Sequence, residues 1–161
     1  MLLRAMTDAD SAAVLDLNAE SVAALSPLDG NRLAALRRVA VRADVVEVDG
    51  EVAAFVLLFA PDAPYDSANF GWFQQRYGEE FVYLDRIAVG APYRRRGIGA
   101  LVYDAAEELA APYRRLACEV DAEPPNAASL AFHDARGFVE VGRLGRPGGK
   151  VAAMLVKELG R

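Results

Sequence analysis

The segment Tyr93-Arg94-Arg95-Arg96-Gly97-Ile98-Gly99-Ala100 is the feature that most restricts the folds open to this chain. It joins an apolar, β-branched strand to a helix rich in Ala and Leu, so its glycines and arginines lie at a helix entrance. The first four N–H groups of a helix have no intrahelical partner and lie at the positive end of the helix dipole, which favours a bound anion. Gly97 and Gly99 lack Cβ atoms and let the backbone approach a bulky diphosphate. The segment therefore predicts a phosphorylated ligand bound between a strand and a helix.

The composition indicates one ordinary domain in a reducing, cytoplasmic compartment. A chain of 161 residues can bury one hydrophobic core, so we expect residues 1–161 to form a single domain. Cys118 is the only cysteine, which excludes a disulfide framework and a cysteine-based metal cluster, and no metal is expected. The longest apolar run, residues 53–60, is far shorter than the roughly 20 residues that span a bilayer, so no membrane association is expected. A net charge of −5 argues against nucleic-acid binding and makes the basic cluster at residues 94–96 more consistent with a small anionic ligand.

The hydrophobic pattern predicts strands interleaved with helices. Strands are expected at residues 2–5, 45–48, 52–59, 81–89, 115–120, 138–144 and 151–159. Helices are expected after a capping box at Thr7 and Asp10, ending before Ser26-Pro27, and at residues 32–41, 99–111 and 126–136. Asp49-Gly50 predicts a hairpin turn, and residues 60–80 read as a long functional loop with a short helix. This order combines hairpins with two crossovers and predicts an α/β fold with a mixed sheet and helices on both faces.

Two other phosphate-binding motifs fit the sequence less well. A Walker P-loop requires G-x-x-x-x-G-K-[ST], and the chain lacks the Lys-Ser/Thr pair. A dinucleotide-binding fingerprint would use Gly97-Ile98-Gly99 with Glu119 about 20 residues further on. However, Val102 replaces the third glycine, and a hairpin precedes the motif where a parallel βαβ unit is required.

Two motifs in the correct order resemble those of the GNAT superfamily of N-acyltransferases. Arg94-x-x-Gly97-x-Gly99, after a strand ending at Val89, resembles the acetyl-CoA-binding motif. Residues 126–138 resemble the second motif, in which an Asn opens a helix that closes with Gly-Phe. The resemblance covers residues 45–159 and implies a mostly antiparallel sheet in which strands 81–89 and 115–120 splay apart. It implies transfer of an acetyl group from acetyl-CoA to a primary amine of a small molecule, an amino acid or a peptide, by direct attack in a ternary complex. A non-catalytic acyl-CoA sensor is the alternative.

The same resemblance implies a set of cofactor-binding residues. The pantetheine arm would pair with the strand backbone near its end, and the diphosphate would lie on the N–H groups of residues 95–100. The polar stripe of the second motif would face the thiol. The predicted cofactor-binding residues are Ile87, Ala88, Val89, Arg94, Arg95, Arg96, Gly97, Ile98, Gly99, Ala100, Asn126 and Ser129.

Acetyl transfer to an amine needs a base, because an amine with a pKa of about 10.4 is almost fully protonated at neutral pH. Asp85 matches a strand carboxylate that many relatives carry, and it is the predicted base. The alternative is a structural pairing of Asp85 with Arg86 or with a helix end, and a β-bulge here would re-aim either side chain.

The departing thiolate gains from an acid. Relatives often carry a tyrosine at the place of His133, which is therefore the predicted acid, with Tyr83 and Tyr103 as substitutes. Asn126, Ser129 and His133 share one helix stripe. The alternative is a partly exposed histidine with no catalytic role.

Aromatic side chains concentrate in residues 60–80. Phe70, Trp72 and Phe73 are the predicted substrate-binding residues, with Tyr65 beside them, and packing within the loop is the alternative. The identity of the amine acceptor is not encoded in any motif. Relatives often dimerise, so a homodimer is an open alternative to a monomer.

Overall fold

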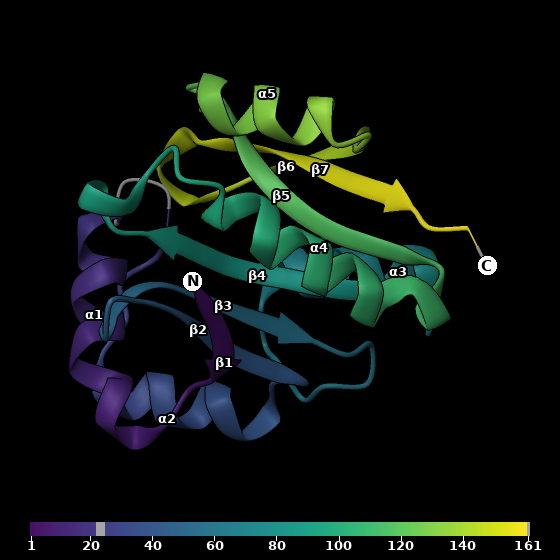
Figure 1. Ribbon diagram of the computed structural model, residues 1–161. Coiled ribbons are helices and arrows are strands. Elements are labelled where there is room, and N and C mark those ends of the chain that lie inside the picture. Colours follow the sequence, from purple (N-terminus) through teal and green to yellow (C-terminus); the bar gives the residue numbers. More distant parts are fainter. Residues whose placement is uncertain (22–24, 161) are drawn as a thin grey trace.

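The computed structural model describes residues 1–21 and 25–160, which form a seven-stranded mixed sheet with helices on both faces (Figure 1). In spatial order the strands are β1 (Leu2–Ala5), β2 (Arg42–Val48), β3 (Glu51–Phe59), β4 (Val82–Val89), β5 (Arg115–Glu123), β7 (Val151–Glu158) and β6 (Val139–Gly145). The α-helices are α1 (Ser11–Glu20), α2 (Gly30–Val39), α3 (Ala68–Tyr77), α4 (Ile98–Ala110) and α5 (Ala127–Ala135). Short 3₁₀ turns occupy Asp8–Asp10, Ala91–Tyr93, Ala111–Tyr113 and Pro147–Gly149. In the two described stretches, no helix is both long and apolar enough to cross a bilayer.

The predicted order of elements is confirmed, and local capping explains several boundaries. Asp49 and Gly50 both adopt positive φ, at 51° and 79°, and form the β2–β3 turn. The carboxylate of Asp10 accepts a hydrogen bond from the Thr7 N–H at 2.8 Å, as the predicted capping box requires. The helix predicted to follow this capping box includes residues 22–24, which lie outside the described residues. β5 extends three residues beyond its predicted end.

The sheet separates two hydrophobic layers. α1, α2 and α3 cover one face, where Phe70 and Phe73 of α3 are fully buried. α4 and α5 cover the other face, and α4 contributes Val102 and Ala106 to its core. Figure 1 shows α4 in front of the central strands and α3 behind them. The predicted helices on both faces are therefore confirmed.

The sheet opens between its central strands. β4 and β5 are parallel and pair only through Val82 with Leu116 and Tyr83 with Ala117, whereas the other neighbouring strands in the described chain are antiparallel. Beyond Tyr83 the two strands diverge, as Figure 1 shows. The edge of β4 that faces β5 thus lacks a partner strand over most of its length, which confirms the predicted splay.

A β-bulge in β4 sets the directions of two charged side chains. Leu58 of β3 pairs with Leu84, and Leu57 pairs with Arg86, so Asp85 is the extra residue. Alternation along a regular strand would send neighbouring side chains to opposite faces. The bulge instead lets Asp85 and Arg86 lie together on the α1 and α3 side, where Arg86 reaches Asn18 of α1.

Candidate active site

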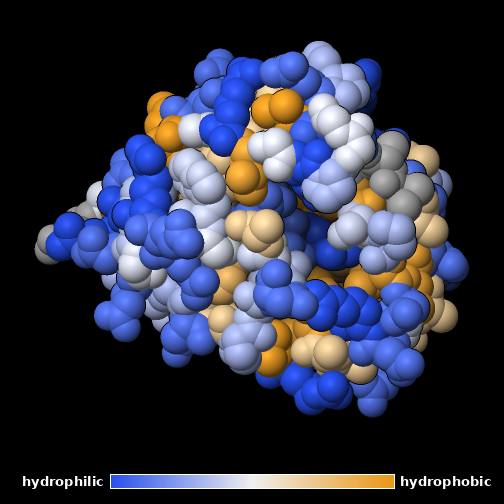
Figure 2. Space-filling model, turned by 180° about the vertical axis from the view of Figure 1, so that it is seen from behind, coloured by the Kyte–Doolittle hydropathy of each residue, from blue (hydrophilic) through white to orange (hydrophobic). Residues whose placement is uncertain are grey.

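The opening between β4 and β5 forms a cavity of about 310 Å³ that joins the two faces of the sheet. A hollow with hydrophilic residues in its depth is visible on the face shown in Figure 2. From the α4 and α5 side, the lining includes Tyr103, Cys118, Asn126, Ser129 and His133. From the α1 and α3 side, it includes Ser26, Tyr65, Asn69, Asp85, Arg86, Glu119, Asp121 and Arg146. Residues predicted from two distant motifs therefore meet in one cavity with residues from the rest of the chain.

The entrance to α4 has the geometry of an anion-binding turn. Gly97 is the N-cap residue with φ of 83°, and Arg95 also has positive φ, at 62°. No side chain among residues 1–21 and 25–160 caps this helix end, so its leading N–H groups are available for a ligand. Arg95, Arg96 and Gly97 are exposed. Arg94 lines the cavity and donates from Nε to the carbonyl oxygen of Val89 at 3.1 Å, which ties the turn to β4.

The free edge of β4 fits an extended ligand arm. Ile87, Ala88 and Val89 line the cavity, and on their other side they pair with β3. Main-chain groups that face the departing β5 have no strand partner there and must be satisfied by a ligand or by water. Together with the uncapped α4 entrance, this edge fits coenzyme A, whose diphosphate and amide-containing arm need these two kinds of partner.

The start of α5 lies across the cavity from this edge. Asn126 caps the helix, its Oδ1 accepting the Ser129 N–H at 3.3 Å. His133 Nδ1 lies 2.7 Å from the Ser129 carbonyl oxygen, which only accepts, so Nδ1 carries the proton. Nε2 therefore accepts a hydrogen bond from the Tyr103 hydroxyl at 2.6 Å. Burial lowers the pKa of His133, which keeps the imidazole neutral near pH 7. The ring N–H of His133 and the hydroxyl proton of Tyr103 are both used in these hydrogen bonds. Neither proton is directed at a position that a thiolate could occupy, so this geometry disfavours the predicted acid role.

Asp85 is engaged on both carboxylate oxygens. Oδ1 accepts from the Tyr65 hydroxyl at 2.7 Å, and Oδ2 accepts from Arg86 Nε at 2.9 Å. The side chains of this ion pair are each only 7% exposed. Arg86 also donates to Asn18 Oδ1 and to the Ser26 carbonyl oxygen, at 3.2 and 3.1 Å. The arrangement matches the ion-pair alternative for Asp85 and joins β4 to α1 and to the segment before α2.

Glu119 is the functional candidate that the sequence prediction did not select. The Tyr83 hydroxyl donates to its carboxylate, 2.7 Å from Oε2, and Asn69 Nδ2 donates to Oε1 at 2.9 Å. Burial and the nearby charge of Asp85 raise the pKa of Glu119 to about 7. Its sequence signal is a single carboxylate within an otherwise apolar buried strand, Leu116-Ala117-Cys118-Glu119-Val120. In the sequence, Glu119 fits only a dinucleotide-binding pattern, which the antiparallel pairing of β3 with β4 excludes.

Tyr83 has no exposed surface and does not line the cavity. Burial, followed by the charge of Glu119, raises its pKa well above the usual value for tyrosine. Its hydroxyl therefore stays protonated and acts as a hydrogen-bond donor that positions Glu119.

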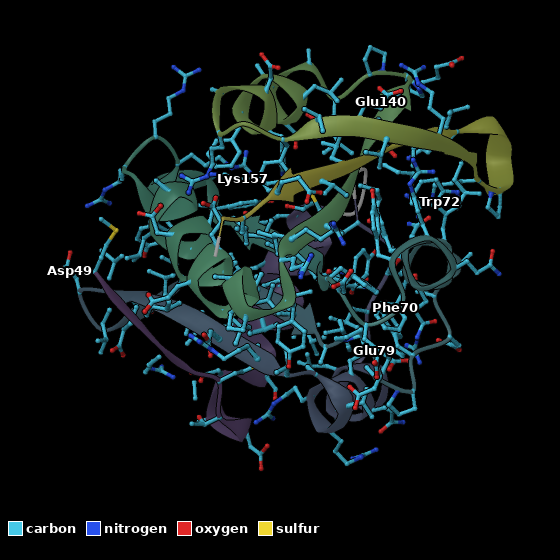
Figure 3. All side chains as sticks on the ribbon, turned by 90° about the vertical axis from the view of Figure 1, so that its right-hand side faces the viewer. Asp49, Phe70, Trp72, Glu79, Glu140 and Lys157 are labelled. Atoms are coloured by element: carbon cyan, nitrogen blue, oxygen red, sulfur yellow. The ribbon has the colours of Figure 1, made fainter. Side chains whose placement is uncertain are left out.

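The three predicted substrate-binding aromatics do not reach the cavity. Phe70 and Phe73 are fully buried in the core between α3 and the sheet, because they occupy the inward stripe of a complete helix rather than a loop. Trp72 lies on the side of α3 that faces the β6–β7 hairpin, whereas Phe70 points into the protein (Figure 3). A Cβ atom on Gly142 of β6 would lie 2.5 Å from Trp72 Cζ2, so the indole packs directly on this glycine. Of the aromatic group at residues 65–73, Tyr65 is the one that lines the cavity.

A protein whose sheet opens in this way beside an anion-binding helix entrance falls in the class of coenzyme A-dependent acyltransferases. Comparison with family models gives the family. The model described as the acetyltransferase (GNAT) family matches residues 13–138, and the chain belongs to that family, whose members use acetyl-CoA.

Solved structures share this fold. Ard1 from Thermoplasma volcanium is 18% identical, with a TM-score of 0.79, over 99% of this chain and 98% of that chain. A ribosomal-protein-alanine N-acetyltransferase from Brucella melitensis is 26% identical, with a TM-score of 0.75, over 99% of this chain and 100% of that chain. The structure of yncA from Salmonella typhimurium with its cofactor acetyl-CoA is 20% identical, with a TM-score of 0.74, over 100% of this chain and 95% of that chain. No curated protein matches the chain significantly.

Proposed function

We propose that this protein transfers the acetyl group of acetyl-CoA to a primary amine, with Glu119 as the general base. The observation that carries the proposal is the placement of the Glu119 carboxyl group, held by Tyr83 and Asn69 on the wall of the cavity beside the free edge of β4, where burial raises its pKa to about 7. When bound, acetyl-CoA supplies the acetyl group as a thioester, and the transfer forms a C–N bond, breaks the C–S bond and releases coenzyme A. The acceptor is a small molecule, an amino acid or a peptide.

The residues proposed to bind acetyl-CoA lie at the entrance to α4, along the free edge of β4 and at the start of α5. The leading N–H groups of α4 from Gly97 to Ala100 would hold the diphosphate, with Arg94, Arg95 and Arg96 adding positive charge. The backbone of Ile87, Ala88 and Val89 would pair with the pantetheine arm. Asn126 and Ser129 face the same cavity from α5.

Glu119 is better suited than Asp85 to remove the amine proton. With a pKa of about 7, about half of the Glu119 side chains are deprotonated at neutral pH, and the proton affinity of this carboxylate exceeds that of an ordinary one. Both oxygens of Asp85 already accept hydrogen bonds, from Tyr65 and Arg86, and its side chain is only 7% exposed, so the carboxylate is poorly placed to meet an amine. Tyr83 and Asn69 fix the direction of Glu119, and the proton passes to it from the amine directly or through one water molecule.

The relative from Brucella melitensis is named for acetylating a protein alanine, which supports an amine acceptor. The free, buried thiol of Cys118 supports a cytoplasmic location.

The test follows free thiol while the protein is incubated with acetyl-CoA and a panel of primary amines. Turnover that depends on an amine supports the proposal, whereas release of thiol at the rate of the amine-free control contradicts it. A second candidate, a non-catalytic acyl-CoA sensor, is favoured by the engaged Tyr103–His133 pair in place of a free acid. Calorimetry that detects acetyl-CoA binding without turnover on any amine would select the sensor.

A further inference from the structure

Arg146 is a cation on the cavity wall whose guanidinium is not hydrogen-bonded within the described part of the chain. It follows β6 and has a side chain that is 30% exposed. Asp121 Oδ1 lies 3.7 Å from its Nη1, beyond hydrogen-bonding range. The Arg146 N–H donates to the Lys150 carbonyl oxygen at 2.7 Å, which fixes the turn that carries the side chain.

The other arginines that line this cavity each donate at least one hydrogen bond to the protein. Arg86 donates to Asp85, Asn18 and Ser26, and Arg94 donates to the carbonyl oxygen of Val89. Arg146 therefore differs from both, because its five N–H donors are left for a ligand or for water.

Arg146 lies on the acceptor side of the cavity, together with the proposed base. Glu119 and Asp121 are two residues apart on β5 and so point to the same face of the sheet, which is the face covered by α3. Glu119 and Arg146 both line the cavity, and the charge of Arg146 acts on the pKa of Glu119 in the direction opposite to burial. Asp121 also lies 3.9 Å from Lys150 Nζ, so this carboxylate is shared between two cations.

We infer that Arg146 binds an anionic group of the acceptor, and that the acceptor is a free amino acid. Its amine would face Glu119 while its carboxylate lies against the Arg146 guanidinium. Arginine binds carboxylates through two parallel hydrogen bonds, and an amino acid carries its amine and carboxylate only a few bonds apart. The amino end of a peptide lacks this carboxylate, because the carboxyl group is part of an amide bond. The inference rests on the proposed function and narrows its substrate class.

The test compares each of the common amino acids with its primary amide as acceptor, using acetyl-CoA and the release of free thiol. The amide keeps the side chain and the amine but has no anionic group. Its amine is also less basic and more often neutral, so a preference for the acid cannot arise from ionisation of the amine. We expect kcat/KM to be about 10- to 100-fold higher for the best amino acid than for its amide, the size of a charge-assisted hydrogen-bonded contact.

Arg146→Gln should remove this preference, because KM rises much more for the amino acid than for the amide, which has no carboxylate for the guanidinium to bind. Amide turnover by the same variant shows that it is folded. Arg143→Gln is the matched control, because Arg143 also belongs to the β6 hairpin but pairs with Glu140 and Glu123 outside the cavity, and this variant should keep the preference.

Equal use of amino acids and amides by the unaltered protein would overturn the inference, and so would an equal loss on both substrates in Arg146→Gln. Acetylation of peptide amino ends but not of free amino acids would also overturn it and leave the proposed function intact. Absence of turnover with every amine, despite measurable acetyl-CoA binding, would instead refute the proposed function.

Discussion

Replacing Glu119 by Gln tests the central assignment by both activity and stability. Gln keeps the shape of the side chain and an oxygen that accepts from Tyr83 and Asn69, but it cannot take a proton. Loss of a general base reduces rates by about 10²- to 10⁴-fold, so we expect kcat/KM to fall by at least about 100-fold. In the unaltered protein, the profile of kcat/KM against pH should rise through an apparent pKa near 7, and the variant should lack this rise.

The same substitution should change how stability depends on pH. The pKa of Glu119 is raised from its ordinary 4.5 to about 7, so the neutral form is favoured by folding. The stabilisation that comes from the neutral form of Glu119 is fully present below about pH 4.5 and is lost as the pH rises through 7. From the two pKa values, the loss approaches about 3 kcal/mol, of which about 2.5 kcal/mol falls between about pH 5 and about pH 9.

Urea unfolding of both proteins at these two pH values measures the effect. The free energy of unfolding of the variant, relative to the unaltered protein, should increase from the lower to the higher pH by about 2.5 kcal/mol. Glu123→Gln is the control, because Glu123 lies on the same strand with a side chain that is 65% exposed. A variant profile that still rises near pH 7 would refute the role of Glu119 as the base. A stability difference that does not change with pH would refute its raised pKa.

Further predictions concern the cofactor turn, the buried ion pair and the packing of α3. Gly99→Glu should weaken acetyl-CoA binding by about 100-fold or more in calorimetry, because a carboxylate beside the diphosphate adds repulsion of a few kcal/mol. Asp85→Asn should lower the free energy of unfolding by about 3 kcal/mol, since it leaves the Arg86 charge buried without its partner, and it should reduce turnover much less than a change at the base. Gly142→Ala should lower the free energy of unfolding by about 1–3 kcal/mol, because its Cβ would displace the Trp72 indole.

Each of these predictions has a matched control. Gly99→Ala places a Cβ at an ordinary 3.5 Å from Phe132 and should keep the fold, so undiminished cofactor binding by the Glu variant would contradict the assigned turn. Loss of turnover in Asp85→Asn with unchanged stability would return the base role to Asp85. Gly145→Ala, on the same strand as Gly142, meets no atom within 4 Å, and equal stability of the two alanine variants would contradict the Trp72 contact.

The order of elements and the glycine-rich turn before α4 followed from the sequence because their signals are local. Hydrophobic periodicity, the Asp49-Gly50 turn and the glycines at residues 97 and 99 act through neighbouring backbone atoms and helix ends. These are properties of short segments, and tertiary packing preserved them. The prediction of splayed strands and of the cofactor came instead from the resemblance of two motifs to those of a known family.

The arrangement of the side chains that line the cavity depended on contacts between distant segments. Phe70 and Phe73 read as loop aromatics until α3 placed them in the core. The bulge that pairs Asp85 with Arg86 arises from the register between β3 and β4. Glu119 becomes a candidate base because burial removes water from its charged form, while Tyr83 and Asn69, 36 and 50 residues away along the chain, hold it in place. A pKa is set by the surroundings of a group in three dimensions, and only the folded chain supplies those surroundings.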